Sequence, residues 1–298
     1  MSEGALETVL RRDRAVVIAA LVMLTVLAWG YTAWLANSIS RMSASAMIPS
    51  TMSAPTMPMD GMSMGAASQA MPSDTASIGM GTMLAPTFAP WTAPHVAFMV
   101  AMWAVMMVGM MLPSAAPVIL IYARVGRQAA AQHKPFAATG FFAGGYLLAW
   151  AVFSLFATAA QWLLERVALL TPMMTTTSAL FGGLVLIAAG LFQWTPLKDS
   201  CLKHCQAPLT FIQHHGGFRR DPLGALAIGF RHGLYCVGCC WALMALLFVG
   251  GVMNSLWIAM LALFVLLEKL VPSGRIISRI AGVGLMAWGA WLLTAALH

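Results

Sequence analysis

The sequence predicts an all-α membrane protein, a polytopic bundle of about seven transmembrane helices. Of its 298 residues, 60% are hydrophobic and only 8% are charged, a composition that excludes an ordinary water-soluble domain. The apolar residues fall in blocks of about 17 to 25, the length at which a helix crosses a hydrocarbon layer of roughly 30 Å. Because lipid offers no partner to an unpaired backbone amide, we expect these blocks to be helices.

Seven apolar blocks are long enough to be read as spans. The first has a second interpretation, a cleaved signal peptide, although its length and its aromatic residues favour a retained helix. The second contains Pro113 and Pro117, which should kink or break it and free backbone carbonyls that the bundle must satisfy. The predicted spans are residues 15–36, 95–122, 136–164, 177–194, 223–250, 255–270 and 276–297.

The basic residues of the short loops predict how the bundle is oriented, because Lys and Arg favour the cytoplasmic side of a membrane. They lie mainly in residues 11–14, 124–134, 198–220 and 275–279, which all fall on one side of the predicted bundle. We therefore expect the N-terminus in the cytoplasm, the C-terminus outside, and a multi-pass protein in the inner (plasma) membrane of a bacterium. The net charge of +7 is explained by this topology and does not indicate a nucleic acid partner.

The chain is expected to have three parts. Residues 1–36 form a cytoplasmic N-terminus and the first helix, residues 37–92 a flexible periplasmic loop, and residues 93–298 a six-helix metal-binding domain. The loop is of low complexity and is predicted to be disordered, and it contains ten methionines between Met42 and Met83. Thioethers favour Cu(I), but a biased linker explains the loop equally well, because neither His nor Cys accompanies these methionines.

Two short cysteine motifs carry the strongest functional signal. Each places three metal-ligating residue types at positions i, i+3 and i+4, which lie on one face if the segment is helical. Thiolate and imidazole groups suit Cu(I) or Zn(II). The candidate ligands are Cys201, His204 and Cys205 in the first motif, Cys236, Cys239 and Cys240 in the second, and His232 one turn before Cys236.

One helix cannot surround an ion, so a closed site needs donors from both motifs or from a neighbouring span. The second span offers a stripe of methionines at three- and four-residue steps, from Met99 to Met111. Such stripes are more often adaptable packing than ligands. We therefore interpret this one as packing or as a conduit, and not as a site.

These motifs resemble those of a bacterial family of integral membrane proteins that carry a domain of unknown function and are predicted to bind metal. The resemblance rests mainly on Cys201-Leu-Lys-His-Cys205 and Tyr235-Cys-Val-Gly-Cys-Cys-Trp241, with Met110-Met-Leu-Pro-Ser114 and Glu268-Lys269 in support. It covers roughly residue 93 to the C-terminus. It implies a helical metal-binding membrane protein linked to copper handling, and it leaves the Met-rich loop without an inherited role.

We expect a protein that binds Cu(I), with Zn(II) as the second choice, for transport or for delivery to metalloenzymes. Its expected partners are the lipid bilayer, the metal ion and a periplasmic or membrane cuproprotein. No enzyme motif is recognisable. One alternative is a membrane thiol-disulfide oxidoreductase using Cys236 and Cys239. The other is a structural or assembly protein.

Three charged residues of the predicted domain have open interpretations. Arg231 is costly to bury, so it should face the bundle interior or a water-filled cavity. Glu268 is either its counter-ion or, together with Lys269, a residue that reaches the inner membrane interface.

Overall fold

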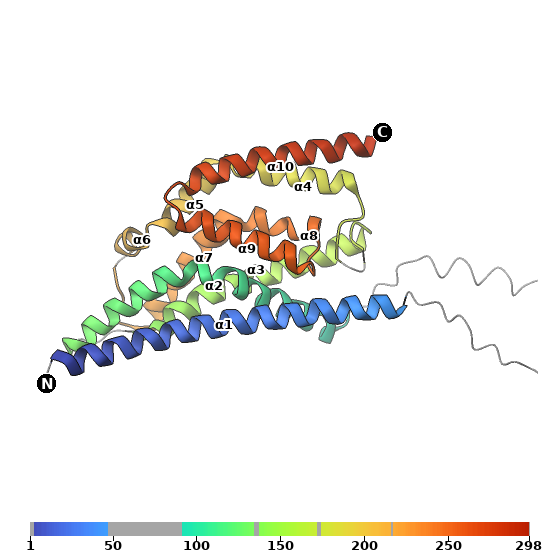
Figure 1. Cartoon of the computed structure of the whole chain (residues 1–298). Coiled ribbons are helices and arrows are strands. Elements are labelled where there is room, and N and C mark those ends of the chain that lie inside the picture. Colours follow the sequence, from blue (N-terminus) through green and yellow to red (C-terminus); the bar gives the residue numbers. More distant parts are fainter. Residues whose placement is uncertain (1–2, 47–90, 134–136, 172–173, 216, 298) are drawn as a thin grey trace, which may run out of the picture.

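The computed structural model describes residues 3–46, 91–133, 137–171, 174–215 and 217–297, which form a bundle of helices (Figure 1). Apart from an isolated bridge between Leu170 and Thr176, these residues contain no β-structure. The all-α prediction is therefore confirmed. The helices are α1 (Glu3–Ala46), α2 (Ala93–Ala131), α3 (Thr139–Arg166), α4 (Ala179–Phe192), α5 (Pro196–Gln206), α6 (Pro208–His214), α7 (Pro222–Ala245), α8 (Leu247–Gly250), α9 (Ser255–Leu270) and α10 (Gly274–Leu297).

Fewer helices than the seven expected are long and apolar enough to cross a membrane. Among the described residues there are five, or six if α4 and α5, which meet at a bend of 64°, count as one span. At 14 residues α4 extends only about 21 Å, and α9, at 16 residues, about 24 Å. The apolar blocks were read correctly as helices, but two of them are too short to span alone.

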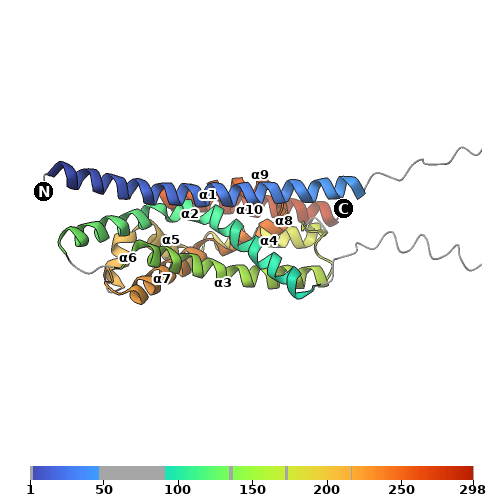
Figure 2. The ribbon, with the colours of Figure 1, turned by 90° about the horizontal axis from the view of Figure 1, so that it is seen from below.

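The prolines of α2 bend the helix without ending it. Helix α2 continues through Pro113 and Pro117 and changes direction along its length (Figure 2). Pro113 has no N–H to give to the carbonyl four residues before it, which belongs to Gly109. Trp29 of α1 donates its indole N–H to that oxygen over 3.2 Å, so the freed carbonyl is satisfied by the bundle as expected and α1 is joined to α2.

Glycines allow α3 and α7 to pack with their backbones almost in contact. A Cβ atom added at Gly145 of α3 would lie 2.0 Å from the Leu226 carbonyl oxygen, and one added at Gly229 of α7 would lie 2.0 Å from that of Phe142. Small residues are the usual means by which membrane helices approach this closely. The close approach lets Tyr146, near the start of α3, reach Cys236 of α7.

Helix α5 packs back against α7 rather than lying in an open loop, and Figure 1 shows it between α4 and α7. It begins where Thr195 caps the Lys198 amide and Pro196 occupies the first turn. At its other end, Gln206 donates its side-chain N–H to the Glu268 carbonyl oxygen at 2.8 Å, which fixes it to α9. The first cysteine motif is therefore held against the second.

The methionine stripe of α2 lies in the core of the bundle. Its members are at most 5% exposed, and they belong to the main hydrophobic cluster. The Met99 sulfur accepts a hydrogen bond from Gln161 at 3.6 Å. The buried positions of these methionines agree with a role in packing the core. A role as a conduit for the metal ion stays a prediction. The stripe consists of Met99, Met102, Met106, Met107, Met110 and Met111.

Candidate metal centre

Four thiols meet where α5 crosses α7, and we call Cys205, Cys236, Cys239 and Cys240 the thiol cluster. The Cys205 sulfur of α5 lies 4.0 Å from the Cys239 sulfur of α7. The three α7 cysteines are at most 2% exposed, and all five cysteines of the chain are free thiols. The fold therefore brings donors from both motifs to one buried place.

The helical spacing of α7 fixes how its thiols point. Cys239 and Cys240 both donate to the carbonyl oxygen of Cys236, at 3.0 and 2.9 Å. Such bonds to the preceding turn hold each side chain in one rotamer. A metal ion would replace these thiol protons, because the thiolate is the form that binds metals.

Cys201 and His204 lie beside the thiol cluster and do not enter it. The Cys201 sulfur would lie 2.9 Å from a Cβ atom built on Gly238, so a glycine is needed for α5 to come this close. The His204 ring stacks on Tyr235 with the ring centres 4.3 Å apart. In the described part of the chain, no three His, Cys, Asp or Glu side chains already stand at metal-binding positions. The full set of predicted ligands stays a prediction.

His232, the remaining predicted ligand, is buried one turn before Cys236. It is 3% exposed, and its ring packs against Phe142, Tyr146 and Phe211. Its Nδ1 atom has no hydrogen-bond partner. A buried polar atom without a partner is unusual and marks a place where a proton donor or a cation would be stabilised.

Two polar residues that were not predicted as site residues touch the thiol cluster. The Lys269 ammonium lies 2.8 Å from the Cys236 sulfur and 3.2 Å from the Ser114 hydroxyl. The Tyr146 hydroxyl lies 3.1 Å from the same sulfur and 3.1 Å from the Met111 carbonyl oxygen, to which it donates. Cys236 therefore stands between a buried cation and a phenol.

The expectations for Glu268 and Lys269 are wrong. Both are buried, so they do not reach an interface. Glu268 pairs with Lys198 of α5 at 2.5 Å rather than with Arg231, and both side chains are fully buried. Gln193 and Ser278 add hydrogen bonds to this pair. The reason is that α5 packs into the bundle and places Lys198 next to Glu268. The sequence analysis treated this segment as a loop and so did not consider Lys198 as a partner.

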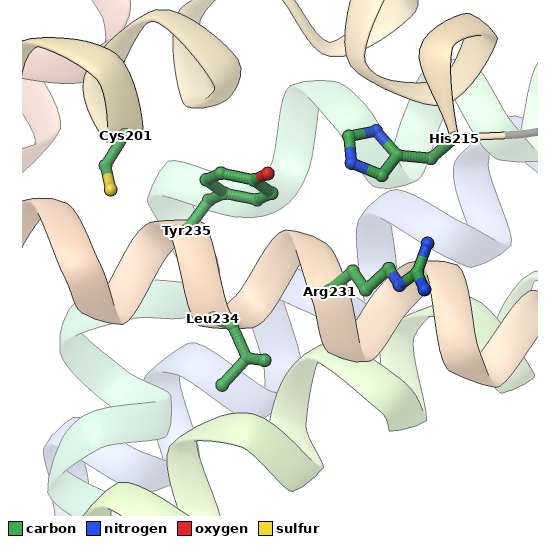
Figure 3. Close-up of a pocket in the computed structure, with 5 residues that line it drawn as sticks. All are labelled: Cys201, His215, Arg231, Leu234 and Tyr235. Atoms are coloured by element: carbon green, nitrogen blue, oxygen red, sulfur yellow. The ribbon is translucent and has the colours of Figure 1, made fainter.

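Arg231 lies at the edge of the bundle, where it is exposed. It lines a cavity of about 370 Å³ between α7 and the α5–α6 segment (Figure 3). The bundle interior is therefore wrong as the environment of Arg231. The side chain does line a cavity, and that this cavity is filled with water stays a prediction. The other residues that line it are Cys201, His215, Leu234 and Tyr235.

The donor set of the centre is soft. Its thiols suit Cu(I) or Zn(II), and no carboxylate of the kind that Mg²⁺ or Ca²⁺ requires is in contact with the described thiols. Together with the long apolar helices, the centre defines a class: a helical protein compatible with a membrane and equipped to handle a soft metal ion.

Comparison with known families agrees with this class. Residues 100–292 match the model of the PpoB2 family, which is described as a copper chaperone. The chain belongs to this family. The match includes every candidate ligand named above and excludes α1 and the Met-rich segment. No curated protein and no solved structure matched the chain.

Proposed function

We propose that this protein is a copper chaperone of the bacterial inner membrane that holds Cu(I) as cargo in the thiol cluster and delivers it to a copper enzyme. The observation that carries the proposal is the contact between Cys205 of α5 and Cys239 of α7, at 4.0 Å, inside a buried cluster. Two or three thiolates are enough for Cu(I), so the cluster needs no further donor. His232 is a supplementary donor, and Cys201 and His204 lie outside the set.

Charge balance favours Cu(I) over Zn(II). Cu(I) held by two thiolates carries one net negative charge, which the Lys269 ammonium beside Cys236 neutralises. An uncompensated charge in this interior would be strongly unfavourable. Zn(II) with the same two thiolates would be neutral and would leave the charge of Lys269 uncompensated, and it requires four ligands in a tetrahedral arrangement.

The family's description as a copper chaperone favours delivery over transport. A copper enzyme in the membrane or the periplasm is the proposed recipient. The proposed topology keeps the N-terminus in the cytoplasm and divides the chain into residues 1–36, 37–92 and 93–298. Most of the Met-rich loop lies outside the described residues, and we assign to it the capture or transfer of copper on the periplasmic side. No catalytic role is proposed.

A thiol-disulfide exchange function remains the second candidate. The sequence indicated Cys236 and Cys239 for it, and that pair stays a prediction. The Cys205 and Cys239 sulfurs are also close enough for a modest movement to join them. The two candidates differ in a thiol count. An oxidised protein would show two fewer titratable thiols and no stoichiometric copper.

The test uses the full chain purified in detergent under reducing conditions and loaded with Cu(I) against a competing chelator. We expect bound Cu(I) in the wild-type protein and its loss in the Cys236→Ser, Cys239→Ser double variant. Cys201→Ser is the matched control, because Cys201 makes no described contact with another thiol, and it should keep the ion. Retention of copper in the double variant would disprove the proposal.

A further inference from the structure

We propose that His204 and His215 form a second copper(I) site, made of two imidazoles, through which the cargo passes between the basic surface of the α5–α6 segment and the thiol cluster. The inference rests on the proposed function and adds a place where the ion stops on its way. His215 does not belong to either cysteine motif, and His204 lies beside the thiol cluster without entering it.

Both histidines are held in the tautomer that binds metals. The Nδ1 atom of His204 lies 2.8 Å from the Ser200 carbonyl oxygen, and that of His215 lies 2.8 Å from the Phe211 carbonyl oxygen. A carbonyl oxygen only accepts, so each Nδ1 carries the hydrogen and each Nε2 keeps its lone pair. Metal-ligating histidines are typically oriented by such a bond from the other ring nitrogen.

The separation of the two rings fits one shared ion. Their centres are 6.2 Å apart. If one ion lies on a straight line between the two Nε2 atoms, with metal–nitrogen bonds of about 2 Å, the centres of the two rings are about 6 Å apart. The angle of 73° between the ring planes is no obstacle, because rotation about a metal–nitrogen bond leaves the bond length unchanged.

Aromatic neighbours hold this arrangement. Tyr235 stacks on His204 at 4.3 Å and lies 5.8 Å from the His215 ring. Phe211 packs against His215 at 4.4 Å. Figure 3 shows Tyr235 between Cys201 on one side and His215 on the other, along the cavity of about 370 Å³. Aromatic contacts therefore hold both imidazoles, His215 at this cavity and His204 at a neighbouring one.

The position of the pair suits transfer to the thiol cluster. His204 directly precedes Cys205, whose sulfur lies 4.0 Å from that of Cys239. Because neighbouring residues of a helix point in different directions, the ion passes from one face of α5 to the next. Two neutral imidazoles leave Cu(I) with its positive charge, and Arg231, which lines the same cavity as His215, opposes its retention. The thiolates of the thiol cluster carry negative charge that compensates the charge of Cu(I). The ion is thus held weakly at the histidines and more tightly at the thiols.

The test combines variants of the full chain with X-ray absorption of bound Cu(I). With all four cysteines of the thiol cluster, Cys205, Cys236, Cys239 and Cys240, changed to Ser, we expect copper bound by nitrogen with no sulfur neighbour. Adding His204→Gln and His215→Gln should abolish this nitrogen-bound copper. His95→Gln in the same background is the control and should retain it, because His95 packs on Trp91 at the start of α2.

A second variant keeps the thiols and so does not depend on folding of the cysteine variant. His204→Gln with His215→Gln should slow the transfer of Cu(I) from a chelator about tenfold while leaving the final number of bound ions unchanged. An unchanged rate, or the absence of nitrogen-bound copper in the cysteine variant, would overturn the histidine site. Wild-type protein whose copper has no sulfur neighbour would instead overturn the thiol site, so the two failures are distinguishable.

Discussion

Lys269 places an ammonium group 2.8 Å from the Cys236 sulfur, where the side chain has almost no access to solvent. Buried lysines are costly unless they are paired, and here the partners are a thiol and the Ser114 hydroxyl. In the proposed function this cation offsets the charge of a copper thiolate. Its position against a candidate ligand makes it the most informative single residue of the site.

We expect Lys269→Met to lower the affinity for Cu(I) at least about tenfold, or about 1.4 kcal/mol, because the bound thiolates lose their counter-charge. Lys203→Met, on the exposed side of α5, is the control and should leave the affinity unchanged. The measurement is competition with a chelator of known affinity. An affinity equal to or higher than that of the wild type would contradict the role given to Lys269.

The sequence alone predicted part of this site. The i, i+3, i+4 spacing correctly placed Cys236, Cys239 and Cys240 on one buried face of a helix, because that inference needs only helical geometry. Tyr146 and Lys269 could not be found in this way, because they are 90 and 33 residues from Cys236 along the chain. A single Tyr or Lys in an apolar helix has no spacing that indicates its partner.

At the scale of elements, the contact between α3 and α7 positions the Tyr146 hydroxyl on Cys236. Gly145→Ala should force the helices apart, because the added carbon would lie 2.0 Å from the Leu226 carbonyl oxygen. We expect the variant to lose about 1 to 3 kcal/mol of unfolding free energy. Gly144→Ala is a matched control, since nothing lies within 4 Å of the added atom there.

Unfolding in detergent, followed by the denaturant midpoint, compares these two glycine variants. The structure requires Gly145→Ala to be the less stable one, and Gly144→Ala to equal or slightly exceed the wild type, because alanine favours helices more than glycine. Equal losses in both variants would show that the close approach of α3 and α7 contributes nothing.

The buried pair of Lys198 and Glu268 anchors α5 to α9, and with it Cys205. Removing one partner leaves an uncompensated buried charge, so Lys198→Met should cost about 3 to 5 kcal/mol. The double variant Lys198→Met, Glu268→Gln should recover most of this loss. Unfolding of the single and double variants measures the coupling. Additive losses would mean that the pair is not an interacting unit.

Helix α5 also explains why the sequence overestimated the number of spans. The fourth apolar block was expected to cross the bilayer by itself, but α4 is only 14 residues long and the chain then turns by 64° into α5. From its polar composition alone, the segment of α5 is expected to be a loop. Only the partners of Lys198, which come from later in the chain, show why it packs inside.

For the whole molecule, the described bundle from α2 to α10 contains the thiol cluster, and the family match begins only at residue 100. Deletion of residues 47–90 should therefore leave the thiol-bound Cu(I) of the purified protein unchanged. Ultraviolet thiolate-to-copper absorption measures this ion without interference from methionine sulfur. Its loss on deletion would show that the site depends on the Met-rich segment.

X-ray absorption of the full wild-type chain loaded with Cu(I) tests the central claim most directly. The account predicts a first shell of two or three sulfurs, as expected for Cu(I) thiolates. That sulfur shell should disappear in the Cys236→Ser, Cys239→Ser variant. A shell made only of nitrogen or oxygen in the wild type, or sulfur that persists in the double variant because methionines supply it, would contradict the thiol cluster as the place where this protein holds copper.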